Sequence, residues 1–382
     1  MQSFLCPTFL HLGEGSHRKV AEALAQRNVQ RVFLVVDSAV RSGEVARGVE
    51  ALLHAQGVSM AVFSDIEPDP SATTVERAFE LCQAHRAQAV IAIGGGSTID
   101  VGKAVAILAT NGGRIHDYEG TEKFTVRPLP RLVIPTTAGT GSEVSGSCVI
   151  SDNERQLKMS IRHARWNPAD VAMLDPLAVA TAPPHVAMHA GLDAFVHAFE
   201  SYLSRGANPV TDALTLHALS LITHHIRPFV ADRSNQEAAS AMLAGSALAG
   251  MAFGVTGLGN VHCMARFVGA FCHVSHGLSN AVCLPHVARF NLPSSPGRFA
   301  RVARAMRCRT DGLSDEAAAQ TAIAAIDQLC ADLGVPARLS AIGAREEQLD
   351  VMARLCVEAN YNRWNPRYTT FEDFRSLFRQ AF

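Results

Sequence analysis

One carboxylate and three imidazoles stand at spacings that could surround a metal ion. Asp193 and His197 are four residues apart in a segment with helical spacing of its apolar residues, so both side chains project from one helix face. His262 and His276 flank a second apolar segment that is compatible with a helix. Three nitrogens and one oxygen suit a divalent metal of the first transition row. Such a metal can hold and polarise an oxygen-bearing substrate.

The chain has sixteen histidines, so one histidine alone is weak evidence for a metal site. The alternative for each is an ordinary core or surface residue. The metal-site interpretation is favoured because a glycine-rich loop of the nucleotide-binding kind lies upstream of these residues. That loop, Gly94-Gly95-Gly96-Ser97, follows an apolar strand pattern and opens a helical one. Glycines there let the backbone approach a phosphate, and a helix N-terminus favours its negative charge. The spacing is neither GxGxxG nor a P-loop, so a plain strand-to-helix turn is the alternative.

Two further features point to a dinucleotide. Asp37 closes an early strand pattern, where an acid commonly binds ribose hydroxyls and repels a 2′-phosphate. The segment Pro135–Glu143 is rich in Thr, Ser and Gly and follows another strand pattern. It could hydrogen-bond a pyrophosphate or the nicotinamide ribose, or it could be an ordinary capped turn.

The elements that must position these residues divide the chain into two domains. Residues 1–182 alternate short apolar runs with helical patterns, which indicates a parallel sheet covered on both faces. The predicted strands are Arg31–Asp37, Met60–Phe63, Ala89–Ile93 and Leu132–Pro135, and the predicted helices include Gly43–Gln56 and Thr74–His85, with Ser71 as an N-cap. Residues 183–382 read as almost entirely helical, with the boundary at Ala182-Pro183-Pro184. We therefore expect a dinucleotide-binding α/β domain over 1–182 and a helical metal-binding domain over 183–382.

Composition narrows the class of protein. Apolar residues make up 48% of the chain and charged residues 18%, and the formal net charge is -1. The arginines are scattered rather than arranged in a stripe, which argues against nucleic acid as a partner. We see no apolar run of about 18–20 residues, which a membrane span needs, and no signal peptide at the N-terminus. Nine cysteines without a CxxC pair indicate reduced thiols. We expect a cytoplasmic protein.

Several motifs in order resemble the iron-containing, group III alcohol dehydrogenases over nearly the full length, and the branch they resemble most is that of lactaldehyde reductase and ethanol dehydrogenase. These motifs are Gly94–Asp100, Pro135–Glu143, Gly191–His197, Gly257–His262, His276-Gly277, Leu284-Pro285-His286 and Asn365-Pro366-Arg367. The resemblance implies an N-terminal Rossmann-like domain with a parallel sheet and an all-α C-terminal domain, which is the dehydroquinate synthase-like architecture. It places the active site in the cleft between the domains.

The resemblance also implies cofactors and site residues. It implies NAD along Gly94, Gly95, Gly96 and Ser97, with Asp37 disfavouring NADP, and a cofactor lining that comprises Asp69, Lys103, Thr136, Thr137, Thr140, Ser145, Ser147 and Lys158. It assigns the metal to Asp193, His197, His262 and His276. Fe(II) is the family's usual metal, although three histidines and one aspartate would also hold Zn(II) or another divalent metal. Many relatives are homodimers, so we expect a homodimer or a higher homo-oligomer.

Three departures from the family pattern concern the substrate. Relatives usually carry a second histidine four residues after the third ligand, where this chain has Arg266; the segment Ala252–Val255 lacks a common Asn pair; and Ser147 replaces an Asn of some relatives. Arginine cannot drop its charge. Arg266 should therefore either bind the anionic group of a substrate or turn to the cofactor pyrophosphate or a nearby acid. The proton route could use the cofactor ribose, solvent or His273. Phe253 and Tyr361 are candidates for the wall of the substrate site, with plain core packing as the alternative.

The predicted function is reversible hydride transfer between NAD(H) and a small primary alcohol or aldehyde, with an anionic substrate under one reading of Arg266. The first alternative is a dehydroquinate synthase-like lyase or cyclase that uses NAD and a metal. That chemistry needs several Lys and Arg residues, and the region 240–290 offers only Arg266 and Arg289. The second alternative is a non-catalytic metal- or nucleotide-binding protein.

Overall fold

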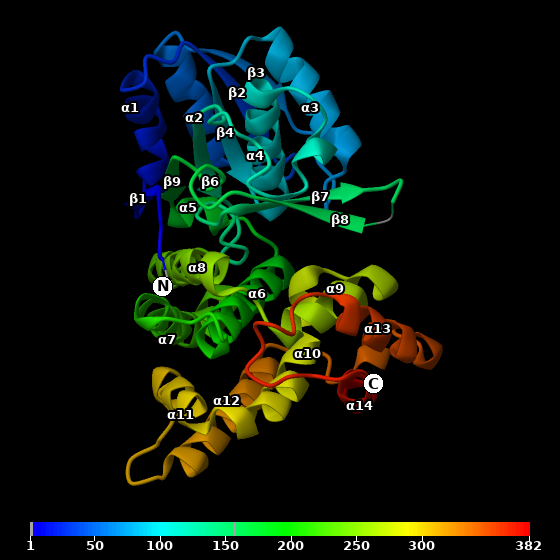
Figure 1. Cartoon of the computed structure of the whole chain (residues 1–382). Helices are drawn as coiled ribbons and strands as arrows, with labels where there is room; N and C mark the ends of the chain where they lie inside the picture. The colour runs from blue at the N-terminus through cyan, green and yellow to red at the C-terminus, as the bar shows by residue number, and fades with distance from the viewer. Residues whose placement is uncertain (1–2, 156) are drawn as a thin grey trace. The chain divides into compact units, whose positions relative to one another are not determined.

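The computed structural model describes residues 3–155 and 157–382, and these residues form two compact units. One unit takes in Leu5–Pro183 and Asp232–Ala247. The other takes in Pro184–Ala231 and Leu248–Phe382. We call them the sheet unit and the helical unit, and Figure 1 labels their elements.

A six-stranded parallel sheet organises the sheet unit. Its strand order is β1-β9-β6-β4-β2-β3. The strands are β1 (Phe9–Leu12), β9 (Val171–Leu174), β6 (Arg131–Pro135), β4 (Ala89–Gly94), β2 (Arg31–Val36) and β3 (Ser59–Phe63). The sequence predicted β2, β3, β4 and β6. It did not predict β1 and β9, which have four residues each.

Alternating side chains of the strands build two cores, one on each face of the sheet. On one face Phe33 and Val35 of β2 belong to the cluster that contains the buried residues of α3 (Ala72–Ala84) and α4 (Gly96–Asn111). On the other face Val32 and Leu34 belong to the cluster with the buried residues of α1 (Lys19–Ala25) and α2 (Glu44–Ala55). Because successive residues of a strand point to opposite faces, one apolar run serves both cores. The expected parallel sheet with both faces covered is thus confirmed.

A second, three-stranded sheet adds to the α4 side. The strands β7 (Ser147–Asp152) and β8 (Leu157–Arg162) pair antiparallel, and β5 (Gly120–Thr121) joins β8. Cys148 and Ile150 of β7, with Met159 and Ile161 of β8, enter the same core as α3 and α4. The sequence analysis did not predict this hairpin.

The helical unit confirms the helical reading of the second half of the chain. Its helices are α6 (Pro184–Leu203), α7 (Pro209–Ala231), α9 (Asn260–Cys272), α10 (His276–Asn291), α11 (Pro296–Ala305), α12 (Asp315–Asp332), α13 (Glu346–Glu358) and α14 (Phe371–Ala381). From Gly191 to its end, α6 is buried at every residue. The helix α10 packs against both α6 and α9. At the contact of α10 with α6, Gly277 lies so close to His189 that a Cβ atom would stand 2.1 Å from its carbonyl oxygen.

The segment between α13 and α14 holds the start of α9. The backbone N–H of Asn260 donates to Asn365 Oδ1 at 3.2 Å, and Asn260 Nδ2 donates to Thr369 Oγ1 at 2.6 Å. Just before α9, Gly257 has a φ of 68° and its missing Cβ makes room for the ring of Trp364. Residues more than a hundred positions later in the chain therefore position the first turn of α9.

One helix corrects the expectation on apolar segments. The helix α8 (Gln236–Thr256) has 21 residues and a mean hydropathy of 1.6, which is enough to span a membrane by length and composition. Small residues such as Ala, Ser and Gly dominate it, so it did not read as an apolar run. About half of its apolar window, 56%, is buried inside the protein. Core helices of soluble proteins have the same length and composition.

Candidate functional site

The residues expected to bind the dinucleotide lie at one edge of the parallel sheet. Val36 of β2 is aligned with Ile93 of β4, and Gly94 of β4 with Pro135 of β6. The carboxyl ends of parallel strands meet at the same edge of the sheet, which is where α/β proteins bind ligands. Asp37, the glycine loop and the loop after β6 therefore meet there.

The glycine loop packs closely against α4 and against the loop after β6, which leaves little room for side chains on its glycines. A Cβ on Gly94 would stand 2.3 Å from Thr98 Oγ1, and one on Gly96 would stand 2.8 Å from Thr140 Cγ2. A Cβ on Gly95 would stand 3.4 Å from Thr137 Oγ1, which is ordinary van der Waals contact. The helix α4 begins at Gly96, so its unpaired N–H groups face this edge. Bare backbone at a helix N-terminus is suited to a phosphate.

Lys103 and Asp100 hold the second loop in place from beneath. Lys103 is buried, and its Nζ donates to Ser142 Oγ at 3.2 Å and to the carbonyl oxygens of Ser145 and Ser147 at 3.1 and 2.7 Å. Asp100 accepts from Ser142 Oγ at 2.6 Å. Burial lowers the pKa of Lys103, while the charge of Asp100 opposes the shift. In this structure, the ammonium group of Lys103 positions the loop that follows β6.

The remaining expected cofactor residues have local partners of their own. Asp37 is half-buried, and its Oδ1 accepts from the backbone N–H of Ala39 at 2.9 Å. Asp69 has a φ of 56° and forms an ion pair with Lys158, whose Nζ is 2.6 Å from Asp69 Oδ1. Thr136 is buried, and its backbone N–H donates to Gly94 O at 3.0 Å.

A second cluster, in the helical unit, brings together Asp193, His262 and His276. One possible ligand atom of each residue lies within 4.8 Å of the other two. Nε2 of His262 is 3.6 Å from Asp193 Oδ1, and Nε2 of His276 is 3.8 Å from the same oxygen. Asp193 and His262 are buried, whereas the His276 side chain is 45% exposed. A cluster that is closed on one side and open on the other leaves room for a substrate.

His197 lies beside this trio. Its Nδ1 is 3.8 Å from Asp193 Oδ2, and its ring stacks on that of His262 at 4.6 Å between centroids. The ring of Phe253 stacks on His197 at 4.5 Å. His197 is thus adjacent to the trio without joining its compact set of ligand atoms, and Phe253 supplies an apolar wall.

The cluster fits a divalent cation by distance and by charge. Ligand atoms that bind one metal at roughly 2.1 Å stand about 3–4 Å apart. Asp193 Oδ1 is 3.6 Å from Nε2 of His262 and 3.8 Å from Nε2 of His276. Burial would raise the pKa of the Asp193 carboxyl, but His197, His262 and His276 hold that pKa well below its usual range. Burial would likewise lower the pKa of His262, yet its hydrogen bonds to Asp193 and Glu200 raise it to about 9. The site therefore attracts positive charge.

Two residues around the cluster were not predicted from the sequence. Glu200 accepts from His262 Nδ1 at 2.7 Å. Asn280 Nδ2 donates to Asp193 Oδ1 at 2.7 Å and lies 3.2 Å from His276 Nε2. Their positions gave a usable signal, because Glu200 lies seven residues after Asp193 and Asn280 lies four residues after His276. Both spacings return a side chain to the ligand's helix face.

The residues expected to affect substrate choice lie in less enclosed places. Arg266, one helical turn after His262 on α9, is exposed. His273 is exposed and ends α9 in the left-handed conformation with a φ of 53°. Tyr361 is half-buried between α13 and α14. The position of each residue does not test its proposed role, so these roles stay predictions.

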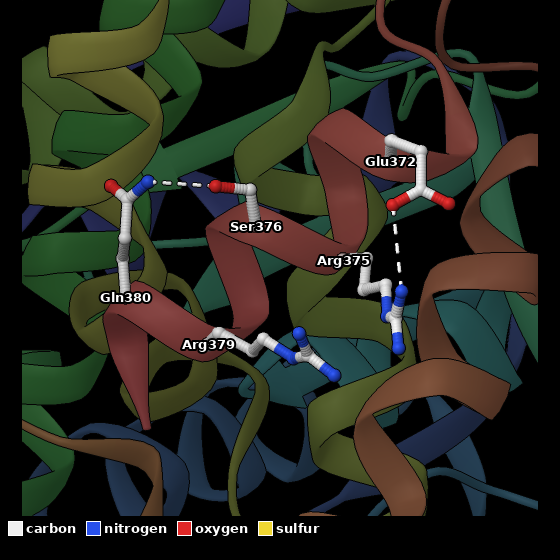
Figure 2. A pocket seen from close by; sticks show the side chains of 5 residues that line it. All are labelled: Glu372, Arg375, Ser376, Arg379 and Gln380. Carbon is white, nitrogen blue, oxygen red and sulfur yellow. Dashed lines mark hydrogen bonds and ion pairs between the residues drawn. The ribbon is translucent and has the colours of Figure 1, made fainter.

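A shallow depression lies on α14 (Figure 2). Its volume is about 300 Å³, and it is lined by Glu372, Arg375, Ser376, Arg379 and Gln380. Four of these side chains interact in pairs. Arg375 Nη1 forms an ion pair with Glu372 at 3.6 Å, and Gln380 Nε2 donates a hydrogen bond to Ser376 Oγ at 3.0 Å. None of the expected site residues lines it.

Comparison with known families matches both halves of the chain. Residues 7–176 match the family described as iron-containing alcohol dehydrogenase. Residues 187–382 match the C-terminal part of the Fe-containing alcohol dehydrogenase family. The two matches contain the sheet-edge loops and the histidine cluster respectively.

Curated proteins and solved structures agree. The chain is 38% identical to 1,3-propanediol dehydrogenase of Citrobacter freundii, covering 100% of this chain and 99% of the relative. It is 34% identical to lactaldehyde reductase of Escherichia coli (strain K12), covering 97% and 96%. A solved 1,3-propanediol oxidoreductase superposes with a TM-score of 0.97 at 36% identity, covering 100% of both chains. The sulfoacetaldehyde reductase of Bifidobacterium kashiwanohense in complex with NAD+ superposes with a TM-score of 0.90 at 26% identity, covering 100% and 98%.

Proposed function

Because this chain belongs to the iron-containing alcohol dehydrogenase family, we propose that it transfers a hydride reversibly between NAD(H) and a small primary alcohol or aldehyde. The observation that carries the proposal is the convergence of Asp193, His262 and His276 in the helical unit. We propose these three residues, together with His197, as the ligands of a divalent metal, with Fe(II) first and Zn(II) as a substitute. The enzyme class itself, an alcohol or aldehyde oxidoreductase, follows from the family.

The residues of this chain have distinct parts in that reaction. The glycine loop and the loop after β6 bind and orient the dinucleotide, and Lys103 keeps the second loop in shape. Asp37, at the end of β2, is suited to the adenosine ribose. The histidine cluster is buried on one side, and Phe253 excludes water next to His197. When bound, a divalent cation supplies Lewis acidity toward the substrate oxygen.

NAD is the proposed cofactor rather than NADP. The carboxylate of Asp37 would repel a 2′-phosphate in the same place. The sulfoacetaldehyde reductase named above was solved with NAD+, which agrees with this choice.

The alternatives are weaker. A dehydroquinate synthase-like lyase or cyclase is not favoured, since the family matches and the full-length relatives are alcohol dehydrogenases and aldehyde reductases. A non-catalytic binding protein would have no need for the nucleotide loop and the metal cluster in one chain.

The test of the proposed function uses protein reconstituted anaerobically with Fe(II) and, separately, with Zn(II). We expect NADH-linked reduction of small aldehydes, with NAD(H) preferred to NADP(H). Asp193→Ala should lose metal and turnover while still binding NADH, because Asp193 and the nucleotide loop belong to different units. Near-normal turnover of Asp193→Ala with demonstrably less metal would rule out the proposed metal role. Equal efficiency with NADP(H) would rule out the role of Asp37.

We further propose that the substrate carries an anionic group and that Arg266 binds it. Arg266 lies four residues after His262 on α9, so both side chains leave the helix on one side. A permanent cation near a divalent metal is favourable only when an anion is close to both. A relative that acts on sulfoacetaldehyde, an anionic aldehyde, supports this choice of substrate class.

We also propose that the protein is a cytoplasmic homodimer or a higher homo-oligomer. The strand β1 forms one edge of the parallel sheet, and Phe9 and Leu12 on it are each 62% exposed. An apolar strand at a sheet edge favours pairing with another chain. The nine cysteines, all free in the structure, suit a reducing compartment.

A further inference from the structure

Glu200 gathers four N–H groups around one buried carboxylate. It lies on α6, three residues after His197, and is 4% exposed. Its oxygens accept from the backbone N–H groups of Gly259, Val261 and His262 at 3.1, 2.6 and 3.3 Å. The fourth donor is the His262 ring, whose Nδ1 is 2.7 Å away. One side chain of α6 thus fixes both the first turn of α9 and the ring of a metal-ligand candidate.

The contact with Glu200 decides which ring nitrogen of His262 is available. A carboxylate only accepts hydrogen bonds, so Nδ1 of His262 must carry the proton. The lone pair of a neutral ring is then on Nε2, which is the nitrogen 3.6 Å from Asp193 Oδ1. Histidines that bind metals commonly donate their other N–H to a carboxylate in this way, which fixes the ring and raises its basicity.

Glu200 also contributes charge. Asp193 and Glu200 are both buried carboxylates, and His262 bridges them with a hydrogen bond on one side and a 3.6 Å approach on the other. Two negative charges balance a divalent cation held between histidines that are neutral. A buried charge is costly unless it is compensated, so the pair favours an occupied site.

We infer that Glu200 is a positioning residue of the metal centre, which presents Nε2 of His262 to the cation and supplies the second negative charge. This inference rests on the proposed metal-dependent function and extends it to a residue outside the ligand set. A purely structural role, in which Glu200 only caps the start of α9, is the competing explanation. The two differ in their effect on metal affinity at constant fold.

The test compares Glu200→Gln with Glu200→Asp. Glutamine keeps an oxygen acceptor of the same length but loses the charge, whereas aspartate keeps the charge on a shorter side chain. The measurement is the dissociation constant for Zn(II) and Co(II), determined by competition with a chelator. We expect metal affinity to fall about 10- to 100-fold in Glu200→Gln, and to fall less in Glu200→Asp. Equal affinity in all three proteins, or a larger loss in the aspartate variant, would overturn the inference.

Two controls separate this result from other failures. NADH binding reports on the sheet unit and should be unchanged in both variants, since Glu200 belongs to the helical unit. Asp193→Ala is measured alongside: if the parent binds metal no better than this variant does, the proposed metal site itself fails.

One readout needs no variant and remains decisive if Glu200→Gln does not fold. Nitrogen-15 NMR of the Zn(II)-loaded parent identifies the protonated ring nitrogen of His262. The proton is expected on Nδ1, and a proton on Nε2 would contradict the inference.

Discussion

The buried carboxylate of Asp193 is stabilised by the individual side chains around it. Its side chain is almost fully buried, yet three histidines surround it and Asn280 donates to its Oδ1 at 2.7 Å. The side-chain amide of Asn280 therefore orients the Asp193 carboxylate and, being neutral, leaves its negative charge uncompensated. Among the residues that the structure describes, the buried Oδ1 of Asn280 has no hydrogen-bond partner, so the contacts of this side chain are those that its Nδ2 makes with Asp193 and the histidines.

The prediction at this scale concerns Arg266. We expect Arg266→His to lower kcat/KM for succinic semialdehyde by about ten- to a hundredfold, since a charge-assisted contact made in the transition state contributes roughly 1.5–3 kcal/mol. The matched neutral substrate is butanal, for which kcat/KM should stay the same or rise. Steady-state kinetics of the parent and the variant on both aldehydes give the answer. An equal fall for both substrates would mean that Arg266 serves the cofactor or the fold.

Residue types and spacing predicted which ligand candidates would meet, but they could not predict how. The four-residue spacing of Asp193 and His197 put both on one helix face, and the structure places His262 and His276 beside them. Glu200 and Asn280 stand at spacings that return them to the helix faces of Asp193 and His276, but this spacing alone does not single out a Glu or an Asn as a partner of the ligands. Whether such a residue touches a ligand depends on how α6, α9 and α10 pack, which spacing along one helix does not report.

At the scale of elements, the contact between α6 and α10 depends on the absence of a side chain at Gly277. We expect Gly277→Ala to push α10 away from α6, because the new Cβ would meet the backbone carbonyl of His189, which cannot rotate aside. Overpacking of this kind costs about 1–3 kcal/mol or more. Thermal unfolding should show the loss of stability. Metal affinity should fall as well, since His276 and Asn280 move with α10.

Gly269→Ala is the matched control for this prediction. Gly269 lies in α9, and a Cβ there would meet Ser279 Oγ and the carbonyl oxygen of Val274, each at 3.4 Å, which is ordinary van der Waals contact. An alanine in a helix interior is favoured over glycine by roughly 0.5–1 kcal/mol. Unchanged or higher stability is expected, and equal destabilisation by both substitutions would show that tight packing at Gly277 is not the cause.

The elements themselves could be predicted in proportion to their length and periodicity. The buried strands β2, β4 and β6 were predicted because each is an uninterrupted apolar run. The hairpin of β7 and β8 was missed because neither strand is an uninterrupted apolar run: LKMSIR alternates apolar and polar residues, and SCVISD has only three apolar residues in a row. Alternation is the pattern of a sheet with one covered face, and here that face is the core of α3 and α4.

At the scale of the whole molecule, the two units divide the proposed chemistry. The sheet unit contains the loops for the dinucleotide, and the helical unit contains the metal cluster, so each part can be tested by binding alone. The edge strand β1 gives the sheet unit a surface for association that neither proposed site uses.

We expect Phe9→Glu combined with Leu12→Lys to weaken self-association. Charged side chains on an edge strand disfavour pairing with a second copy. Size-exclusion chromatography with light scattering at several protein concentrations would show a shift toward smaller species. Tyr368→Lys, at a side chain 66% exposed in the helical unit, is the control and should leave the oligomer unchanged. A parent that is monomeric at all concentrations would contradict the proposed homodimer.

The tie between Asn260 and the residues before α14 has a consequence for biosynthesis. His262 lies in the first turn of α9, and that turn is fixed by Asn365 and Thr369, which the ribosome adds more than a hundred residues later. The dinucleotide loops belong to the sheet unit, whose last residue is Ala247. This unit can fold while synthesis continues, since domains fold as units from the N-terminal end. The metal cluster has to wait for the last part of the chain. A nascent protein can therefore acquire its nucleotide-binding loops early, whereas iron has a finished site to enter only once translation has ended.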